Sequence, residues 1–121
     1  MTAVEPPREA LEGVRAAVQA VDDLKGRAVL ALDLRGLSDA TDYFVLASGT
    51  SDAHVRGMAE NVIEKLHRRG YRPHHVEGLP GGRWVLLDFV DFVVHLFHPD
   101  SRSFYQLERL WSDAPGLELG A

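Results

Sequence analysis

Two strongly apolar segments lie in the last third of the chain, with a break of only two residues between them. Residues 83–89 (RWVLLDF) and 92–98 (FVVHLFH) are rich in β-branched and aromatic residues, which is the composition of strands. Because the break is so short, the two segments are expected to form a tight hairpin. Asp88, Asp91 and His95 lie among these large apolar residues. The region is therefore either a chemical site or a docking surface.

Helix and strand signals alternate along the first half of the chain. Apolar residues recur at helical spacing between Pro6 and Gly26. Two apolar strands are expected at 28–34 and 43–48, both in the interior of a sheet. A second helix is expected to begin after Ser51, its N-cap.

The second half of the chain completes the pattern. Gly70 is expected to end the second helix, and residues 72–77 predict a more polar strand near a sheet edge. After Pro99 a last helix is expected, with an apolar side made by Phe104, Leu107, Leu110 and Trp111. The order α-β-β-α-β-β-β-α predicts one α/β domain over residues 1–111, a mixed five-stranded sheet with helices packed on it. Residues 112–121 are expected to form a mobile tail.

Composition narrows the classes of function. A chain of 121 residues fits one domain with a real core. The net charge of −5 argues against a large direct grip on nucleic acid and is compatible with a basic protein partner. The sequence has no cysteine, no apolar run long enough for a bilayer and no secretory pattern at its start. We therefore expect a cytoplasmic protein without membrane contact.

Six histidines raise the question of a metal site. His74 and His75 are adjacent, and His95 and His98 are three apart, so each pair points to opposite faces of a strand. No pair has the i, i+4 spacing of a zinc helix, and cysteine ligands are absent. The sequence therefore predicts no metal and no cofactor.

Asp88 and Asp91 could form a carboxylate pair for acid–base chemistry, because a hairpin turn could bring them together. Aspartate is also common in turns, where it makes local hydrogen bonds, and this explains both residues without catalysis. A recognition role for their charge is the favoured interpretation.

Gly49-Thr50-Ser51 at a strand-to-helix junction could hold a phosphate on the helix N-terminus. The segment matches neither a Walker loop nor GxGxxG, so a tight turn with an N-cap is the favoured interpretation. Ser48, Ser51, His54 and His95 supply nucleophile and base types, but no GxSxG elbow accompanies them.

The two tryptophans are large anchors with one polar atom each. Trp111 is expected to pack between the last helix and the sheet. Trp84 stands at a strand start beside a glycine turn, where it could be partly exposed. For Trp84 the core and a protein interface, in which tryptophan is a favoured hot spot, both stay open.

Five segments follow one another in a specific order, namely ALDL (31–34), DYFVLASGTSDAHV (42–55), VEG (76–78), WVLLDFVDFVVHLF (84–97) and SRSFYQLERLW (101–111). Together they resemble the ribosomal silencing factor family, RsfS, also called iojap or YbeB. The resemblance runs from about residue 23 to residue 111, which is most of the chain.

The resemblance implies a nucleotidyltransferase-like α/β fold and a partner, the fourteenth protein of the large ribosomal subunit. Family members bound there block subunit joining and repress translation during nutrient limitation, organellar relatives act in large-subunit assembly, and members can form homodimers. Related nucleotidyltransferases carry a carboxylate-x-carboxylate metal pair after their Gly-Ser helix start. This chain offers only Glu77 on the next strand, so a binding protein rather than an enzyme is expected.

On this interpretation the partner-binding residues are Trp84, Asp88, Phe89, Val90, Asp91, His95, Tyr105 and Glu108. Trp84 would be the buried anchor, and the two aspartates would face basic side chains of the partner. The family usually has glycine where this chain has Val90, which leaves the turn geometry open. Two alternatives remain: a large-subunit assembly factor without a silencing role, and a nucleotide-binding enzyme that uses residues 49–51.

Overall fold

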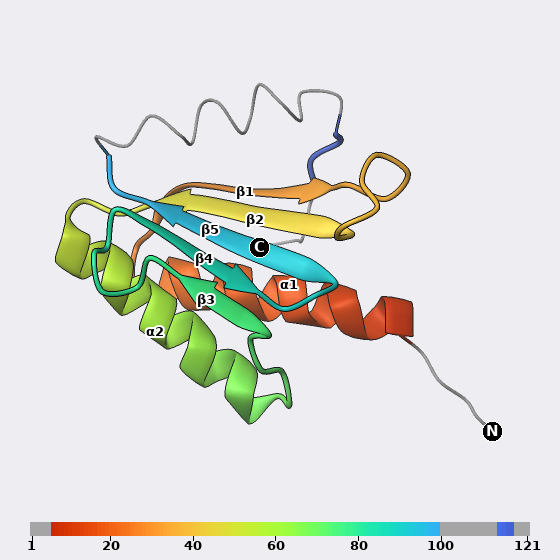
Figure 1. Cartoon of the computed structure of the whole chain (residues 1–121), viewed down its shortest axis with the longest axis horizontal. Coiled ribbons are helices and arrows are strands. Elements are labelled where there is room, and N and C mark those ends of the chain that lie inside the picture. The colour runs from red at the N-terminus through yellow and green to blue at the C-terminus, as the bar shows by residue number, and fades with distance from the viewer. Residues whose placement is uncertain (1–5, 100–113, 118–121) are drawn as a thin grey trace.

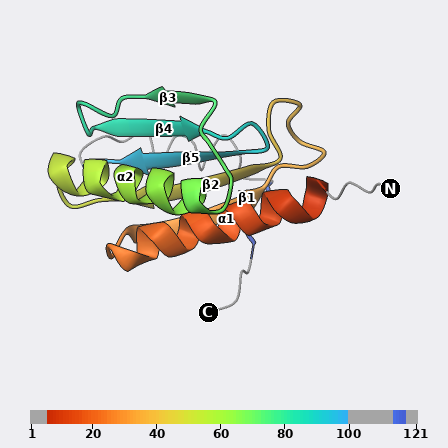
Figure 2. The ribbon, with the colours of Figure 1, turned by 90° about the horizontal axis from the view of Figure 1, so that it is seen from below.

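The computed structural model describes residues 6–99 and 114–117, with side chains described from residue 10 onward. It contains a five-stranded sheet with both helices on one face (Figure 1; Figure 2). The elements in chain order are α1 (Pro6–Asp23), β1 (Arg27–Asp33), β2 (Tyr43–Ser48), α2 (Asp52–Arg68), β3 (His75–Glu77), β4 (Trp84–Asp88) and β5 (Phe92–Phe97). The predicted single α/β domain with a mixed five-stranded sheet is confirmed.

The strand order across the sheet is β1-β2-β5-β4-β3. Neighbouring strands are antiparallel except for β2 and β5, which run parallel and pair from Tyr43 opposite Phe92 to Ser48 opposite Phe97. The expected hairpin is β4–β5. The expected edge strand is β3, but β1, which was expected in the interior, ends the sheet on the other side.

Helix α2 begins and ends as its sequence predicts. The Ser51 side chain accepts a hydrogen bond from the backbone N–H of His54 at 3.0 Å, which satisfies one of the free amides of the first turn. Gly70, beyond the last turn, has φ +92, a conformation that costs glycine little. Strand β3 is shorter than expected and begins at His75, which pairs with Asp88, the last residue of β4.

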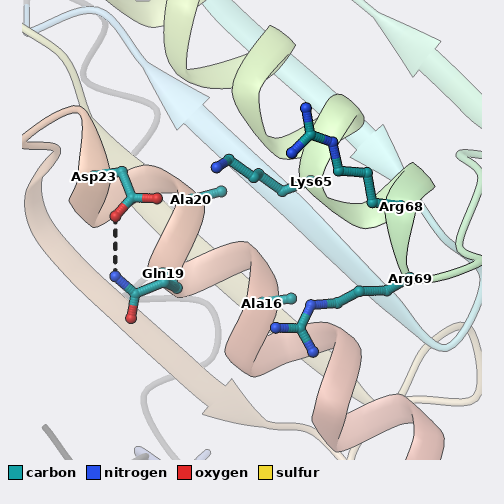
Figure 3. Close-up of a pocket in the computed structure, with 7 residues that line it drawn as sticks. All are labelled: Ala16, Gln19, Ala20, Asp23, Lys65, Arg68 and Arg69. Carbon is teal, nitrogen blue, oxygen red and sulfur yellow. Dashed lines mark hydrogen bonds between the residues drawn. The ribbon is translucent and has the colours of Figure 1, made fainter.

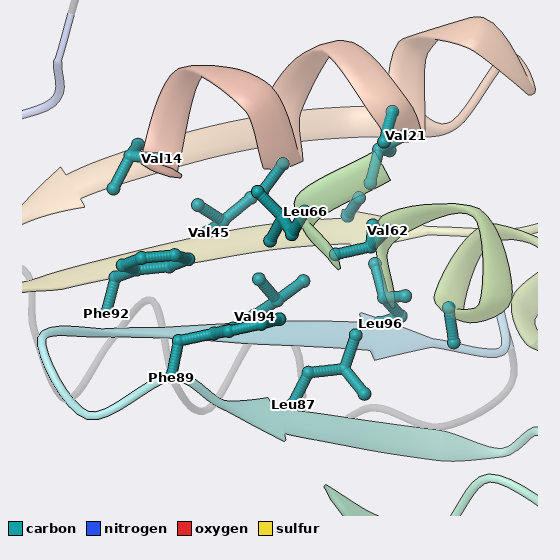
Figure 4. Packing of buried hydrophobic residues seen from close by; sticks show 14 of the residues in the cluster. Val14, Val21, Val45, Val62, Leu66, Leu87, Phe89, Phe92, Val94 and Leu96 are labelled. Atoms are coloured by element: carbon teal, nitrogen blue, oxygen red, sulfur yellow. The ribbon is translucent and has the colours of Figure 1, made fainter. Parts of the chain in front are cut away.

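One large core lies between the sheet and the two helices (Figure 4). Side chains from both helices meet those from the central strands there, as the fully buried Val14, Val62, Val45 and Leu96 show. A smaller cluster on the other face of the sheet contains Leu32, Leu34, Leu46 and Phe97. The central strands are therefore buried on both faces, which explains their continuous apolar sequences.

Residues 114–117 are attached to the outer side of β1. The backbone N–H of Asp33 donates to the carbonyl of Pro115 at 2.9 Å, and that of Leu117 donates to the carbonyl of Ala31 at 2.8 Å. For these four residues the attachment differs from the expected mobile tail. The predicted last helix, with Tyr105, Glu108 and Trp111, lies outside the described residues. Within the described ranges, no helix is long and apolar enough to cross a membrane.

Candidate docking surface

Strand β4 presents alternate side chains to the two faces of the sheet. Val85 and Leu87 are fully buried in the core under the helices. Because strand side chains alternate, Trp84, Leu86 and Asp88 share the opposite face. The pattern of exposure agrees, since these three are exposed or half-buried. The face of β4 that points away from α1 and α2 therefore carries an aromatic, an aliphatic and an acidic side chain in one row.

The ring of Trp84 is held in place although it is 40% exposed. Its indole Nε1 donates a hydrogen bond to Nδ1 of His95 at 3.2 Å. Its ring centroid lies 5.3 Å from that of Phe97, the residue opposite it on β5. Trp84 is thus an exposed aromatic surface on a rigid support, which combines the two readings that the sequence left open.

His95, which accepts the hydrogen bond from the Trp84 indole, is only 5% exposed. Burial lowers the pKa of its imidazole to about 4, so the ring is neutral near pH 7. Because Nδ1 accepts from Trp84, the ring hydrogen is on Nε2, and the Phe44 ring lies edge-on with its centroid 4.7 Å away. Nε2 is buried and, within the part of the chain that the structure describes, has no hydrogen-bond partner. His95 is therefore largely covered by its neighbours, and its role in partner binding stays a prediction.

The turn between β4 and β5 is fixed by Asp88. Its Oδ1 accepts from the backbone N–H of Val90 at 2.8 Å, the local aspartate contact that its turn position predicts. Val90 has φ +76 and is 53% exposed. The turn therefore keeps a left-handed residue although valine replaces the glycine usual in the resembled family, and Val90 projects into solvent.

The two residues beside Val90 point in different directions. Phe89 is 7% exposed and stacks on Phe92 with ring centroids 4.9 Å apart. Its ring packs in the core of the domain, and its role in filling a partner contact stays a prediction. Asp91 is exposed, and its backbone carbonyl accepts from the N–H of Asp42 at 3.1 Å. Its charge is thus presented at the end of the sheet.

A hollow of about 220 Å³ opens beside Trp84 and is lined by Glu77, Gly78, Trp84 and Leu86. Glu77 pairs with Leu86 across the β3–β4 ladder. The carboxylate of Glu77 lies 2.6 Å from Nε2 of His75. Sequence reasoning missed this hollow, although the alternation along β4 places Leu86 on the same face as Trp84.

A larger hollow of about 400 Å³ lies between α1 and α2 on the other side of the sheet (Figure 3). Lys65, Arg68 and Arg69 line it, and Arg68 also pairs with Glu64 at 2.8 Å. These cations stand at the C-terminal end of α2, where they offset the negative end of the helix dipole. The helix dipole therefore explains the positive charge here without a ligand.

The start of α2 uses its polar groups internally. The backbone N–H of Thr50 donates to Nδ1 of His54 at 2.8 Å, and Nε2 of the same ring lies 2.7 Å from the carbonyl of Leu24. Two amides that a phosphate would need are thus bonded, one to His54 and one to Ser51. Among the described residues, no group of three or more His, Asp and Glu side chains could hold a metal ion.

Fold and surface together define an α/β domain whose most distinctive exposed feature is an aromatic and acidic sheet face. The family model described as "Ribosomal silencing factor during starvation" matches residues 7–121. The chain belongs to this family, as its sequence motifs predict.

Individual relatives agree with the family assignment. The ribosomal silencing factor RsfS of Bacillus subtilis is 42% identical over 106 residues, which cover 88% of this chain and 90% of that protein. A crystal structure of a Bacillus halodurans protein superimposes with a TM-score of 0.82 at 39% identity, over 90% of this chain and 99% of that one. The mouse protein "Mitochondrial assembly of ribosomal large subunit protein 1" is 37% identical over 75 residues, 60% of this chain and 33% of its own length.

Proposed function

We propose that this protein binds the large ribosomal subunit through the fourteenth large-subunit protein and blocks joining with the small subunit. Translation would then be repressed under nutrient limitation, and the protein would act in the cytoplasm. The mechanism is steric, since a face occupied by this domain cannot accept the small subunit. It needs no cofactor and no turnover, so the protein is not an enzyme.

The observation that carries this proposal is the supported exposure of Trp84. A large aromatic side chain that is 40% exposed, hydrogen-bonded below and packed on Phe97 loses little freedom when a partner covers it. Tryptophan in such a position is typical of interface hot spots. Asp88, at the other end of β4 on the same face, and Asp91, at the end of the turn, add negative charge that suits a basic ribosomal protein.

The docking surface comprises Trp84, Leu86, Val90 and Asp91, with Asp88 shaping the turn. Phe89 and His95 contribute from beneath, the first by anchoring the turn in the core and the second by holding the indole. Tyr105 and Glu108 stay predicted contacts. The homodimer that the family resemblance implies also stays a prediction.

Co-sedimentation with isolated subunits tests the binding step. The protein is expected to travel with large subunits and not with small subunits at moderate salt. Addition of the protein before the small subunit should then reduce the fraction of joined ribosomes in a sucrose gradient. Failure to travel with large subunits would remove the basis of the proposal.

A role in large-subunit assembly is the second candidate, favoured by the name of the mouse relative. The two roles share one docking surface and differ in when it is occupied. Deletion of the gene separates them: precursor particles of the large subunit in growing cells would indicate assembly. Normal subunits in growth, combined with excess translation during starvation, would indicate silencing.

A further inference from the structure

We infer that the hollow beside Trp84 is a receptor for one arginine side chain of the protein partner. The inference rests on the proposed docking function and names the group that the docking surface recognises. The hollow measures about 220 Å³ and is lined by Glu77, Gly78, Trp84 and Leu86. Each of its walls matches a different part of an arginine side chain.

The aromatic wall matches the guanidinium plane. Arginine stacks on tryptophan faces within about 6 Å of the ring centroid, and tryptophan is the best aromatic partner for a cation. Trp84 is suited to this contact because His95 and Phe97 fix its ring while 40% of the residue stays exposed. The stacking surface is thus ready before the partner arrives.

The acidic wall matches the charge. Glu77 stands opposite Leu86 in the ladder, so its carboxylate borders the floor of the hollow. Oε2 of this carboxylate also lies 2.6 Å from Nε2 of His75. A carboxylate has two oxygens and can take a forked guanidinium contact, which a lysine ammonium cannot match.

The floor matches the aliphatic stem. Leu86 is half-buried in the row between Trp84 and Asp88, and it offers apolar contact to the three methylene groups of arginine. Gly78 closes one side with φ +78, and a Cβ at that position would collide with the carbonyl oxygen of Trp84. The glycine lets the chain after β3 pass close against the start of β4, which brings Glu77 and Trp84 to the same hollow.

Charge complementarity selects a protein partner over nucleic acid at this site. The chain carries a net charge of −5, and the hollow contributes a carboxylate and no described lysine or arginine. A phosphate backbone would be repelled by Glu77, whereas an arginine of a basic protein would be attracted. Reversing the charge at Glu77 should therefore weaken binding to a basic protein and strengthen binding to nucleic acid.

The first test is the affinity for isolated large subunits, measured for wild type, Glu77→Lys and Glu60→Lys. Glu60 is an exposed residue of α2, on the other side of the sheet, so its reversal changes net charge equally and leaves the hollow intact. Glu77→Lys is expected to weaken binding about tenfold or more, because the new lysine would repel the partner's arginine inside a contact that excludes water. Glu60→Lys is expected to bind like wild type. If Glu77→Lys binds large subunits as tightly as wild type, the arginine receptor is overturned. Tighter binding than wild type would also overturn it and would indicate contact with RNA. In both cases, binding of wild type to large subunits would still support the docking function.

The second test needs no ribosome and therefore fails separately from the docking proposal. N-acetyl-arginine methylamide is titrated into the ¹⁵N-labelled protein, and the indole N–H signal of Trp84 is followed after assignment with Trp84→Phe. A saturable shift is expected in wild type, smaller with the matching lysine compound and absent in Glu77→Lys. An unchanged Trp84 signal, or an equal shift in Glu77→Lys, would contradict the inference.

Discussion

Truncation of Trp84 should weaken binding to the large subunit by a calculable amount. The residue is 40% exposed, and a tryptophan offers up to about 250 Å² of surface, so about 100 Å² is available for a partner to cover. At about 25 cal/mol per Å² this area corresponds to about 2.5 kcal/mol of binding free energy. Trp84→Ala is therefore expected to raise the dissociation constant for large subunits about 60-fold.

The assay is a binding titration with fluorescently labelled protein and isolated large subunits. Trp84→Phe serves as the matched control, because it keeps most of the aromatic area and loses only the hydrogen bond to His95. It should bind more tightly than Trp84→Ala. Circular dichroism and thermal unfolding must show that both variants are folded. If folded Trp84→Ala binds within about threefold of wild type, a loss well under 1 kcal/mol, the hot-spot reasoning is refuted.

Four further predictions concern the support of this surface. The pKa of His95 is about 4 in the folded protein and near 6.5 in the unfolded protein. Between these two values the unfolded state therefore binds more protons than the folded state. The free energy of unfolding should fall by up to about 3 kcal/mol as the pH drops from 6.5 to 4. Denaturant unfolding across this range should show a flatter profile for His95→Leu; parallel profiles would contradict the assignment. Phe89→Ala should lower the free energy of unfolding by about 3–5 kcal/mol, because its ring is in the core. A loss below about 1 kcal/mol would show that the ring contributes little to the core and would favour a surface role. Val90→Gly should stabilise the protein by about 0.5–1 kcal/mol, since relief of a left-handed valine outweighs the entropy of glycine; lower thermal stability would argue against this turn. Gly78→Ala should destabilise far more than Gly36→Ala, because both have positive φ but only the first Cβ meets backbone, and equal melting temperatures would speak against the close approach at Trp84.

The sequence predicted elements best where local chemistry decides them. Ser51 is the N-cap of α2 because a serine hydroxyl can reach the amide of His54 wherever this helix packs. Strand β2 has the predicted bounds, and β4 and β5 form the predicted hairpin, because a two-residue break permits little else.

The arrangement of the strands could not be predicted in the same way. The parallel pairing of β2 with β5 joins residues almost fifty positions apart and leaves β1 at the end of the sheet. A local sequence pattern gives no information about a pairing between residues so far apart in the chain. The continuous apolar sequence of β1 suggested an interior strand, and the attachment of residues 114–117 along its outer side explains why such a sequence suits the end of the sheet.

Only part of the candidate site could be predicted from the sequence, because the rest depends on the pairing of the strands. The exposure of Trp84 and the turn role of Asp88 follow from their positions in the chain. The burial of His95 and the contribution of Glu77 depend on which residue stands opposite which across two ladders. That register is fixed by the whole sheet and not by the segments themselves.

Site-specific photo-crosslinking tests the central claim most directly, since it reports which surface meets which ribosomal protein. A photoreactive amino acid is placed at Leu86 on the docking face and, as control, at Glu60 on α2, and each variant is irradiated with large subunits. The account predicts a crosslink from position 86 to the fourteenth large-subunit protein, identified by mass spectrometry, and none to that protein from position 60. A crosslink to it from position 60 alone, or crosslinks from position 86 only to other proteins or RNA, would contradict the account.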